Sequence, residues 1–154
     1  MNVEYINPFI EASKSILMQM TGINTTLGKV YLKDSPYYSD NVMVIVGLTG
    51  KLRGQAMFTM SVNTAKKIAS KMMGGMVLDQ LDEIAKSAIA ELTNMILGNT
   101  ATILYNRGIG IEITPPSFLM GDNMQVSSTK VKTICIPLVM EDGDTMEIDI
   151  AVQD

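Results

Sequence analysis

The chain has 154 residues, of which 47% are hydrophobic and 18% charged, and it carries a net charge of −4. This length and composition are typical of a single globular domain over residues 1–154, exclude disorder, and leave no apolar stretch near the ~20 residues that cross a bilayer. The mild acidity argues against a nucleic-acid partner, and the absence of histidine beside a single cysteine, Cys135, excludes a zinc site, a Ser-His-Asp triad, a Cys-His pair and an intrachain disulfide.

The first third of the sequence predicts one helix followed by a β-hairpin. Its first five residues lack the basic cluster and apolar middle of a secretory signal, so a cytoplasmic protein is expected. Apolar side chains at helical spacing predict a helix over residues 3–20. The expected buried stripe is Ile6, Phe9, Ile10, Ser13, Ile16, Leu17 and Met20. After an exposed loop at 34–40, a hairpin over 42–60 follows, in which Gly47 and Gly54 indicate a bulge or a close backbone approach.

Two further helices and four strands are predicted in the rest of the chain. Ser61 or Asn63 caps a helix over residues 64–73. Asp79 is the expected cap of a long helix that runs to Asn106 and spans about 40 Å at a rise of about 1.5 Å per residue. Strands are then expected at 109–113, 117–120, 131–140 and 146–152, with the last hairpin turn at Asp142-Gly143.

The order of elements repeats, which predicts an α/β fold of the α+β kind with two related halves. A helix, a Gly-Ile pair, an extended segment and a hairpin occur first around Gly22-Ile23 and again around Gly108-Ile109. Long helices are expected to pack on a mixed β-sheet. Because Gly-Ile is a common helix stop, coincidence is the alternative. The 14 methionines, such as the pairs Met57 and Met60 or Met72 and Met76, and the cysteine are expected to pack in the core rather than bind a metal.

The long helix carries two different faces. Its expected core arc consists of Ile84, Ala85, Ala88, Leu92, Met95 and Ile96. A second stripe of small or polar residues runs through Ser87, Glu91, Asn94 and Gly98, at spacings that align them along one side. Glycine within a helix is less stable than alanine by about 1 kcal/mol, which suggests that another group approaches this stripe closely. The alternative is that Glu91 and Asn94 simply form a solvated face.

This helix resembles the phosphatase helix of the CheC/CheX/FliY family of chemotaxis phosphatases. The family pattern is Ser or Asp, three residues, Glu, two residues, Asn, and a proline further along the chain. The sequence supplies it as Ser87-Ala88-Ile89-Ala90-Glu91-Leu92-Thr93-Asn94 and later Pro115-Pro116. Met72-Met73-Gly74-Gly75-Met76 ahead of the helix, the helix-first start and the length are similar to the CheX branch in particular.

The resemblance implies a hydrolase that removes the phosphoryl group from the phosphoaspartate of a CheY-type response regulator. In the family the motif Asn directs the attacking water and the motif Glu contacts a lysine of the regulator, roles that fall here on Asn94 and Glu91. Ser87, Gly98, Pro115 and Pro116 are then expected to shape the groove that receives the partner. The chain itself is expected to bind no cofactor and no metal, because Mg²⁺ sits in the regulator's acidic site.

The resemblance also implies a homodimer paired through its sheet, with strands from Val131 onward as candidate edges. The first helix offers only Asn7, Glu11 and Lys14 at the motif spacing, with lysine where the amide should be, so one site per chain is expected. A non-catalytic adaptor that uses the same groove to hold a receiver domain or a second copy is the competing interpretation. A small-molecule phosphatase is disfavoured, because the sequence offers no obvious metal ligands.

Overall fold

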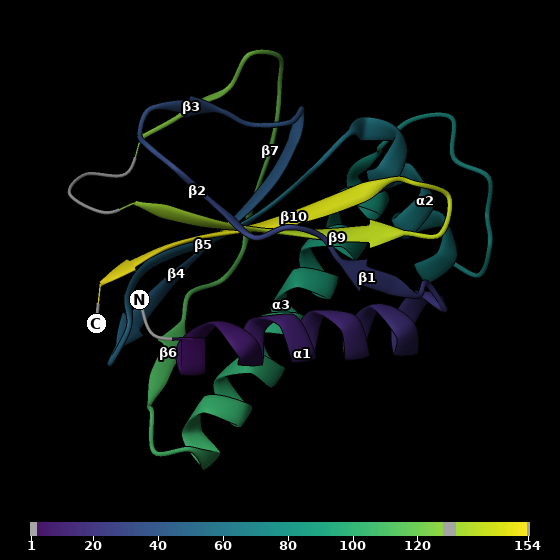
Figure 1. Ribbon diagram of the computed structural model, residues 1–154. Coiled ribbons are helices and arrows are strands. Elements are labelled where there is room, and N and C mark those ends of the chain that lie inside the picture. The colour runs from purple at the N-terminus through teal and green to yellow at the C-terminus, as the bar shows by residue number, and fades with distance from the viewer. Residues whose placement is uncertain (1–2, 128–131, 154) are drawn as a thin grey trace.

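The computed structural model describes residues 3–127 and 132–153, which form three helices on one β-sheet (Figure 1). The elements are α1 Val3–Thr21, β1 Thr25–Leu27, β2 Tyr31–Lys33, β3 Tyr37–Tyr38, β4 Val42–Gly50, β5 Arg53–Met60, α2 Val62–Met72, α3 Glu83–Asn106, β6 Ile111–Ile113, β7 Ser117–Met120, β8 Gln125–Val126, β9 Thr133–Met140 and β10 Thr145–Gln153. None of the helices in these described ranges is long and apolar enough to span a bilayer. Val131, the expected start of the ninth strand, lies outside them.

The main sheet has eight strands, in the order β1-β9-β10-β5-β4-β6, with β2 also paired to β9 and β7 also paired to β4. Strands β3 and β8 form a separate two-stranded ribbon. The expected α+β class, with helices packed on a sheet, is confirmed. The strand pairs within the described residues are all antiparallel, where a mixed sheet was expected.

The two related halves are confirmed by the way they exchange strands. In the first half, β1 and β2 follow α1 and pair with β9, which belongs to the second half. In the second half, β6 and β7 follow α3 and pair with β4 of the first half. The hairpins β4–β5 and β9–β10 meet where β5 pairs with β10 at the centre of the sheet. Each helix-and-strands unit therefore completes the other unit's hairpin.

Side-chain alternation gives the sheet two different faces. Along β10, Met146, Ile148 and Ile150 belong to the large core beneath the helices, while Glu147 and Asp149 point to the opposite side. Figure 1 shows α1 and α3 together on one side of the sheet and the β3 ribbon on the other. Helix α1 packs against α3, and one buried core joins residues of the three helices to residues of β4, β5, β9 and β10.

The first helix and its neighbours follow the sequence closely, with local exceptions. The stripe of α1 is buried as expected except at Ile10, which is half-buried, and Met20, which is 37% exposed in the last turn. The 34–40 segment is not only a loop, because it contains β3 and a half-buried Tyr37. Met57 and Met60 are buried and Met72 is half-buried, whereas Met76 is exposed.

Helix α3 begins later than expected, because Asp82 and not Asp79 is its cap. The Asp82 carboxylate accepts a hydrogen bond from the backbone N–H of Ala85 at 2.8 Å. The expected core arc is wrong at Ile84, which is 67% exposed in the first turn. The buried residues are Ala85, Ile89, Leu92, Thr93, Ile96, Leu97, Thr100 and Leu104. The core side of the helix is therefore rotated toward Ile89 and Leu97, and Glu91 lies on the side away from it.

Candidate functional site

Glu91 and Asn94 form one wall of an open groove on α3. Glu91 is exposed and Asn94 is half-buried, one helical turn apart. Within residues 3–127 and 132–153, neither side chain has a hydrogen-bond or ion-pair partner, which leaves an amide and a carboxylate available to a ligand.

The opposite wall is the segment between β6 and β7. Ile113, Thr114, Pro115 and Pro116 line, together with Glu91 and Asn94, a hollow of about 360 Å³. The prolines reach α3 because β6 and β7 both pair with β4, which carries the segment between them along the edge of the helix layer. The structure thus brings the two prolines to the two polar residues of the predicted motif.

Ser87 lies in an adjoining hollow one turn toward the start of α3. This hollow has a volume of about 370 Å³ and is lined by Glu83, Lys86, Ser87, Ala90, Pro116, Phe118 and Met120. Pro116 lines both hollows, so together they form one groove along the helix. Gly98 lines neither of them, and a Cβ added there would meet no atom of the described residues within 4 Å. Any close approach to Gly98 must therefore come from another molecule.

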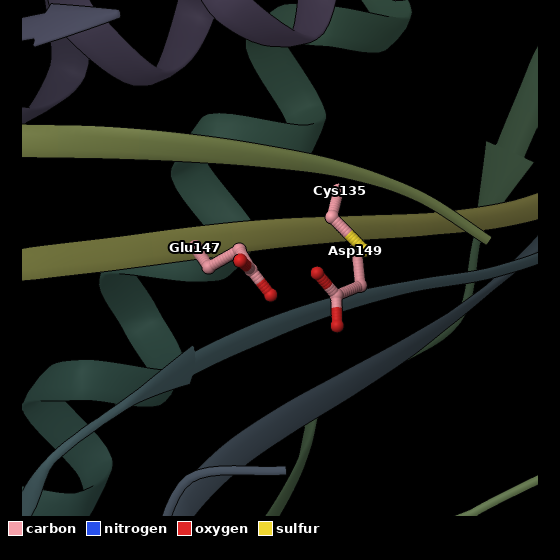
Figure 2. A group of neighbouring side chains, drawn as sticks. All are labelled: Cys135, Glu147 and Asp149. Atoms are coloured by element: carbon pink, nitrogen blue, oxygen red, sulfur yellow. The ribbon is translucent and has the colours of Figure 1, made fainter. Parts of the chain in front are cut away.

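A second polar cluster lies on the far face of the sheet, away from the groove. Figure 2 shows the side chains of Cys135, Glu147 and Asp149 close together. One ligand-type atom of each residue lies within 4.8 Å of those of the other two. The ammonium of Lys33 lies 3.0 Å from Glu147 Oε2 and 3.8 Å from Asp149 Oδ2. The position that a cation would take beside the two carboxylates is therefore already occupied by a lysine.

The protonation of this cluster follows from its burial. Burial first, and then the hydrogen bond and charge of Glu147, raise the pKa of Asp149 to about 7. Burial, followed by the charges of the same two carboxylates, raises the pKa of the Cys135 thiol, which disfavours the thiolate that a metal would need. The pKa of Lys33 is raised overall. Burial alone would lower this pKa, but the hydrogen bond to Glu147 and the charges of Asp149 and Glu147 outweigh the effect of burial. The cluster is therefore an ion network in which the charge of Lys33 offsets that of the carboxylates.

Tyrosines of the first half close this network. Tyr31 donates its hydroxyl to Glu147, and Tyr37 donates to Asp149 Oδ2 at 3.1 Å. The Lys33 ammonium also lies 4.5 Å from the centroid of the Tyr37 ring. The network therefore fastens β2 and β3 to the far face of β9 and β10, which is a structural role.

A protein-family model matches the part of the chain that contains α3. The family model described as chemotaxis phosphatase CheX matches residues 42–139, which include all of α3 and the proline wall. The chain belongs to the CheX family. Its membership makes it a phosphoaspartate phosphatase, in agreement with the resemblance predicted from the α3 motif.

CheX relatives match the chain from end to end. The CheY-P phosphatase CheX of Thermotoga maritima is 30% identical over 153 residues, which cover 99% of this chain and 98% of that protein. The crystal structure of a CheX-CheY-BeF3-Mg²⁺ complex from Borrelia burgdorferi contains a similar chain, with 33% identity, a TM-score of 0.85, and 99% and 100% of the two chains covered. A chemotaxis protein CheX from Desulfovibrio desulfuricans is 28% identical, with a TM-score of 0.85 over 97% and 99% of the chains.

Sequence reasoning missed part of this CheX groove and all of the far-face network. Thr114 stands in the proline wall, and its only signal was its place directly before Pro115. Glu83 and Lys86 line the Ser87 hollow, although exposed charges in a first helical turn looked like ordinary solvation. The far-face network was hidden because Glu147 and Asp149 alternate with apolar residues, a pattern that normally indicates an exposed face.

Proposed function

We propose that this chain hydrolyses the phosphoaspartate of a CheY-type response regulator, with Asn94 as the residue that orients the attacking water. The observation that carries the proposal is the open groove in which a half-buried Asn94 and an exposed Glu91, both without partners in the described chain, face Pro115 and Pro116. The related chain that forms a complex with CheY, BeF3 and Mg²⁺ supports the choice of partner.

An amide suits this reaction because an aspartyl phosphate is already a reactive mixed anhydride. Its hydrolysis needs a water placed in line with the P–O bond, and holding reactants in line can supply several kcal/mol without a strong base. The carboxamide of Asn94 can accept a hydrogen bond from such a water and can also donate one to it. Partial burial on α3 limits the rotamers of this side chain and so holds the amide in place.

Glu91 is proposed to contact the lysine of the regulator's active site. It lies one turn before Asn94 and is exposed, so a cation on a docking partner can reach it without displacing any residue of this chain. Such a charge pair sets the register of docking more than its strength. Ser87, Pro115 and Pro116 are proposed to shape the groove around the partner's loop. Gly98, which lines neither hollow, is proposed to leave room on α3 for the partner, and Mg²⁺ is proposed to stay in the partner.

The decisive experiment compares two asparagines of the same helix. We expect Asn94→Ala to reduce the stimulated loss of phosphate from a ³²P-labelled regulator by at least about 100-fold, because positioning effects reach this size. Asn99→Ala is the matched control, since Asn99 is a half-buried asparagine of α3 that lines neither hollow. Full turnover by Asn94→Ala would overturn the proposal.

A second assay separates catalysis from docking. We expect Glu91→Ala to weaken binding of the BeF3-activated regulator, and Asn94→Ala to leave it unchanged within about 2-fold, because Asn94 acts on water. Equal binding by wild type and Glu91→Ala would contradict the assigned contact. Intact binding of the activated regulator without any stimulated loss of phosphate by the wild type would instead favour the non-catalytic adaptor.

The remaining parts of the proposal concern assembly. We propose that residues 1–154 act as one domain, in the cytoplasm, as a homodimer paired through the sheet. Sedimentation of the purified protein across a concentration series measures the oligomeric state, and a monomer at every concentration would contradict the dimer.

A further inference from the structure

The proline wall begins at a β-bulge on the edge of the sheet. Strand β4 pairs with β6 up to Leu48↔Ile113 and with β7 from Ile45↔Ser117. Between these two pairs β4 contributes residues 46–47, whereas the partner strand contributes residues 114–116. One extra residue on one strand is the definition of a bulge, and bulges next to active sites redirect the chain.

Thr114 alone fastens this bulge to β4. Proline has no backbone N–H, so neither Pro115 nor Pro116 can donate to the sheet. The N–H of Thr114 donates to the carbonyl of Gly47 at 3.0 Å, and its Oγ1 accepts from the N–H of Gly47 at 2.8 Å. The same hydroxyl donates to the carbonyl of Pro115 at 3.3 Å. A side-chain oxygen thus replaces the backbone acceptor that the bulge has moved away.

We call the two hydrogen bonds between Thr114 and Gly47 the clamp, and Gly47 is suited to it because it has no side chain. A Cβ at Gly47 would lie 3.1 Å from Cγ2 and 3.2 Å from Oγ1 of Thr114, closer than most real Cβ contacts. Any larger residue would therefore push the Thr114 side chain, and with it the start of the proline wall, away from β4.

The related half of the molecule has the same bulge without the clamp. There β9 pairs through Leu27↔Leu138 and Tyr31↔Cys135, so residues 28–30 face residues 136–137. The backbone bond is kept, because the N–H of Gly28 donates to the carbonyl of Pro137 at 2.9 Å. The second bond cannot form, since Gly28 has no hydroxyl and Pro137 has no N–H. Only the half that carries Glu91 and Asn94 holds its bulge with a side chain.

We infer that Thr114 is a positioning residue of the phosphatase site, which holds the Pro115–Pro116 wall at a fixed distance from Asn94 through its double hydrogen bond to Gly47. This inference rests on the proposed role of Asn94. The wall confines the space in which the phosphoryl group and the attacking water meet the amide. A shift of about 1 Å in such a wall is enough to lower a rate by about 100-fold while leaving distant docking contacts intact.

The test removes the hydroxyl and keeps the shape. For Thr114→Val we expect kcat for regulator dephosphorylation to fall at least about 10-fold with KM unchanged within about 2-fold, because the lost interaction positions and does not bind. We also expect hydrogen exchange at the Gly47 amide to accelerate at least about 10-fold, because its acceptor is gone. Thr114→Ser keeps the oxygen and should restore both quantities.

A pair of glycine variants gives the test independently of Thr114→Val, should that variant fold poorly. Gly47→Ala pushes Thr114 and should lower kcat. Gly28→Ala meets Pro137 Cβ at 3.2 Å in the related bulge and should leave kcat unchanged. If Asn94→Ala is inactive, either of two results overturns the inference about Thr114. One is a normal kcat in Thr114→Val, and the other is an equal kcat in the two glycine variants. An active Asn94→Ala would instead refute the proposed function, whatever the behaviour of Thr114.

Discussion

Replacing Asp149 by asparagine should remove a pH dependence of stability that the far-face network creates. Asp149 is fully buried, its Oδ2 accepts from Tyr37, and its Oδ1 has no hydrogen-bond partner among the described residues. The carboxylate also shares its surroundings with Glu147, and the single ammonium of Lys33 lies nearer to Glu147. The folded protein therefore favours the protonated form of Asp149, and its pKa rises to about 7.

The direction and size of this change in the free energy of unfolding with pH follow from proton linkage. An unfolded chain has an aspartate pKa of about 3.9, so between about pH 4 and pH 7 the folded state holds a proton that the unfolded state has lost. The contribution of Asp149 to the free energy of unfolding is therefore largest below pH 4, falls between pH 4 and pH 7, and is constant above pH 7. Each pKa unit corresponds to about 1.4 kcal/mol, so the loss from pH 5 to pH 8 has an upper size of about 3 kcal/mol.

Urea unfolding at pH 5, 6, 7 and 8 measures this effect as the difference between wild type and Asp149→Asn. The asparagine cannot ionise. We therefore expect the free energy of unfolding of Asp149→Asn, minus that of wild type, to increase by up to about 3 kcal/mol from pH 5 to pH 8. The pKa of Glu147 is lowered, because its hydrogen bonds with Asp149, Tyr31 and Lys33 outweigh its burial. Glu112→Gln, at an exposed site on β6, is the control and should follow wild type. Parallel curves for wild type and Asp149→Asn would refute the reasoning.

Two matched pairs test the packing of the fold. Gly54→Ala should destabilise by about 3 kcal/mol or more, because its Cβ would lie 2.0 Å from the carbonyl oxygen of Ala151 at a φ of +146°. Gly98→Ala should stabilise by about 0.5–1 kcal/mol, since open space surrounds that helical position. Ile89→Ala should cost about 2–5 kcal/mol and Ile84→Ala less than about 0.5 kcal/mol, because only Ile89 is buried. Denaturant unfolding curves check all four variants. An equal loss in the free energy of unfolding within either pair would contradict the packing assigned to that pair.

The sequence predicted the elements and the halves because local signals agree with the fold. Helical spacing in α1 and the glycine turns at Gly22 and Gly143, both with positive φ, marked the boundaries. The error at the start of α3 has a physical cause. Both Asp79 and Asp82 can cap a helix, and the choice is made by Leu81, which is only 7% exposed and is held against the core just before the first turn.

The candidate site was predictable as a motif but not as a place. The spacing of Glu91 and Asn94 puts them on one side of any helix, whatever its surroundings. The partner wall depends on two strand pairings with β4, and these join residues far apart in the sequence. Gly47 did signal a bulge or a close backbone approach, and Thr114 lies against it. The sequence could not say which residue approaches Gly47, because the strand register is set by pairing between distant segments.

The two related halves differ at the positions that the proposed site uses. Helices α1 and α3 are each followed by a pair of short strands with a bulge between them, so the two halves share the same order of elements. On α1, Glu11 is engaged by the guanidinium of Arg107 at 3.5 Å, and the position of the amide carries Lys14. The bulge between β1 and β2 lacks the side-chain hydrogen bond that Thr114 makes in the other half. Helix residues and bulge differ together between the halves, which is expected if the wall and the amide work as one unit and is unexplained if the bulge serves only the sheet.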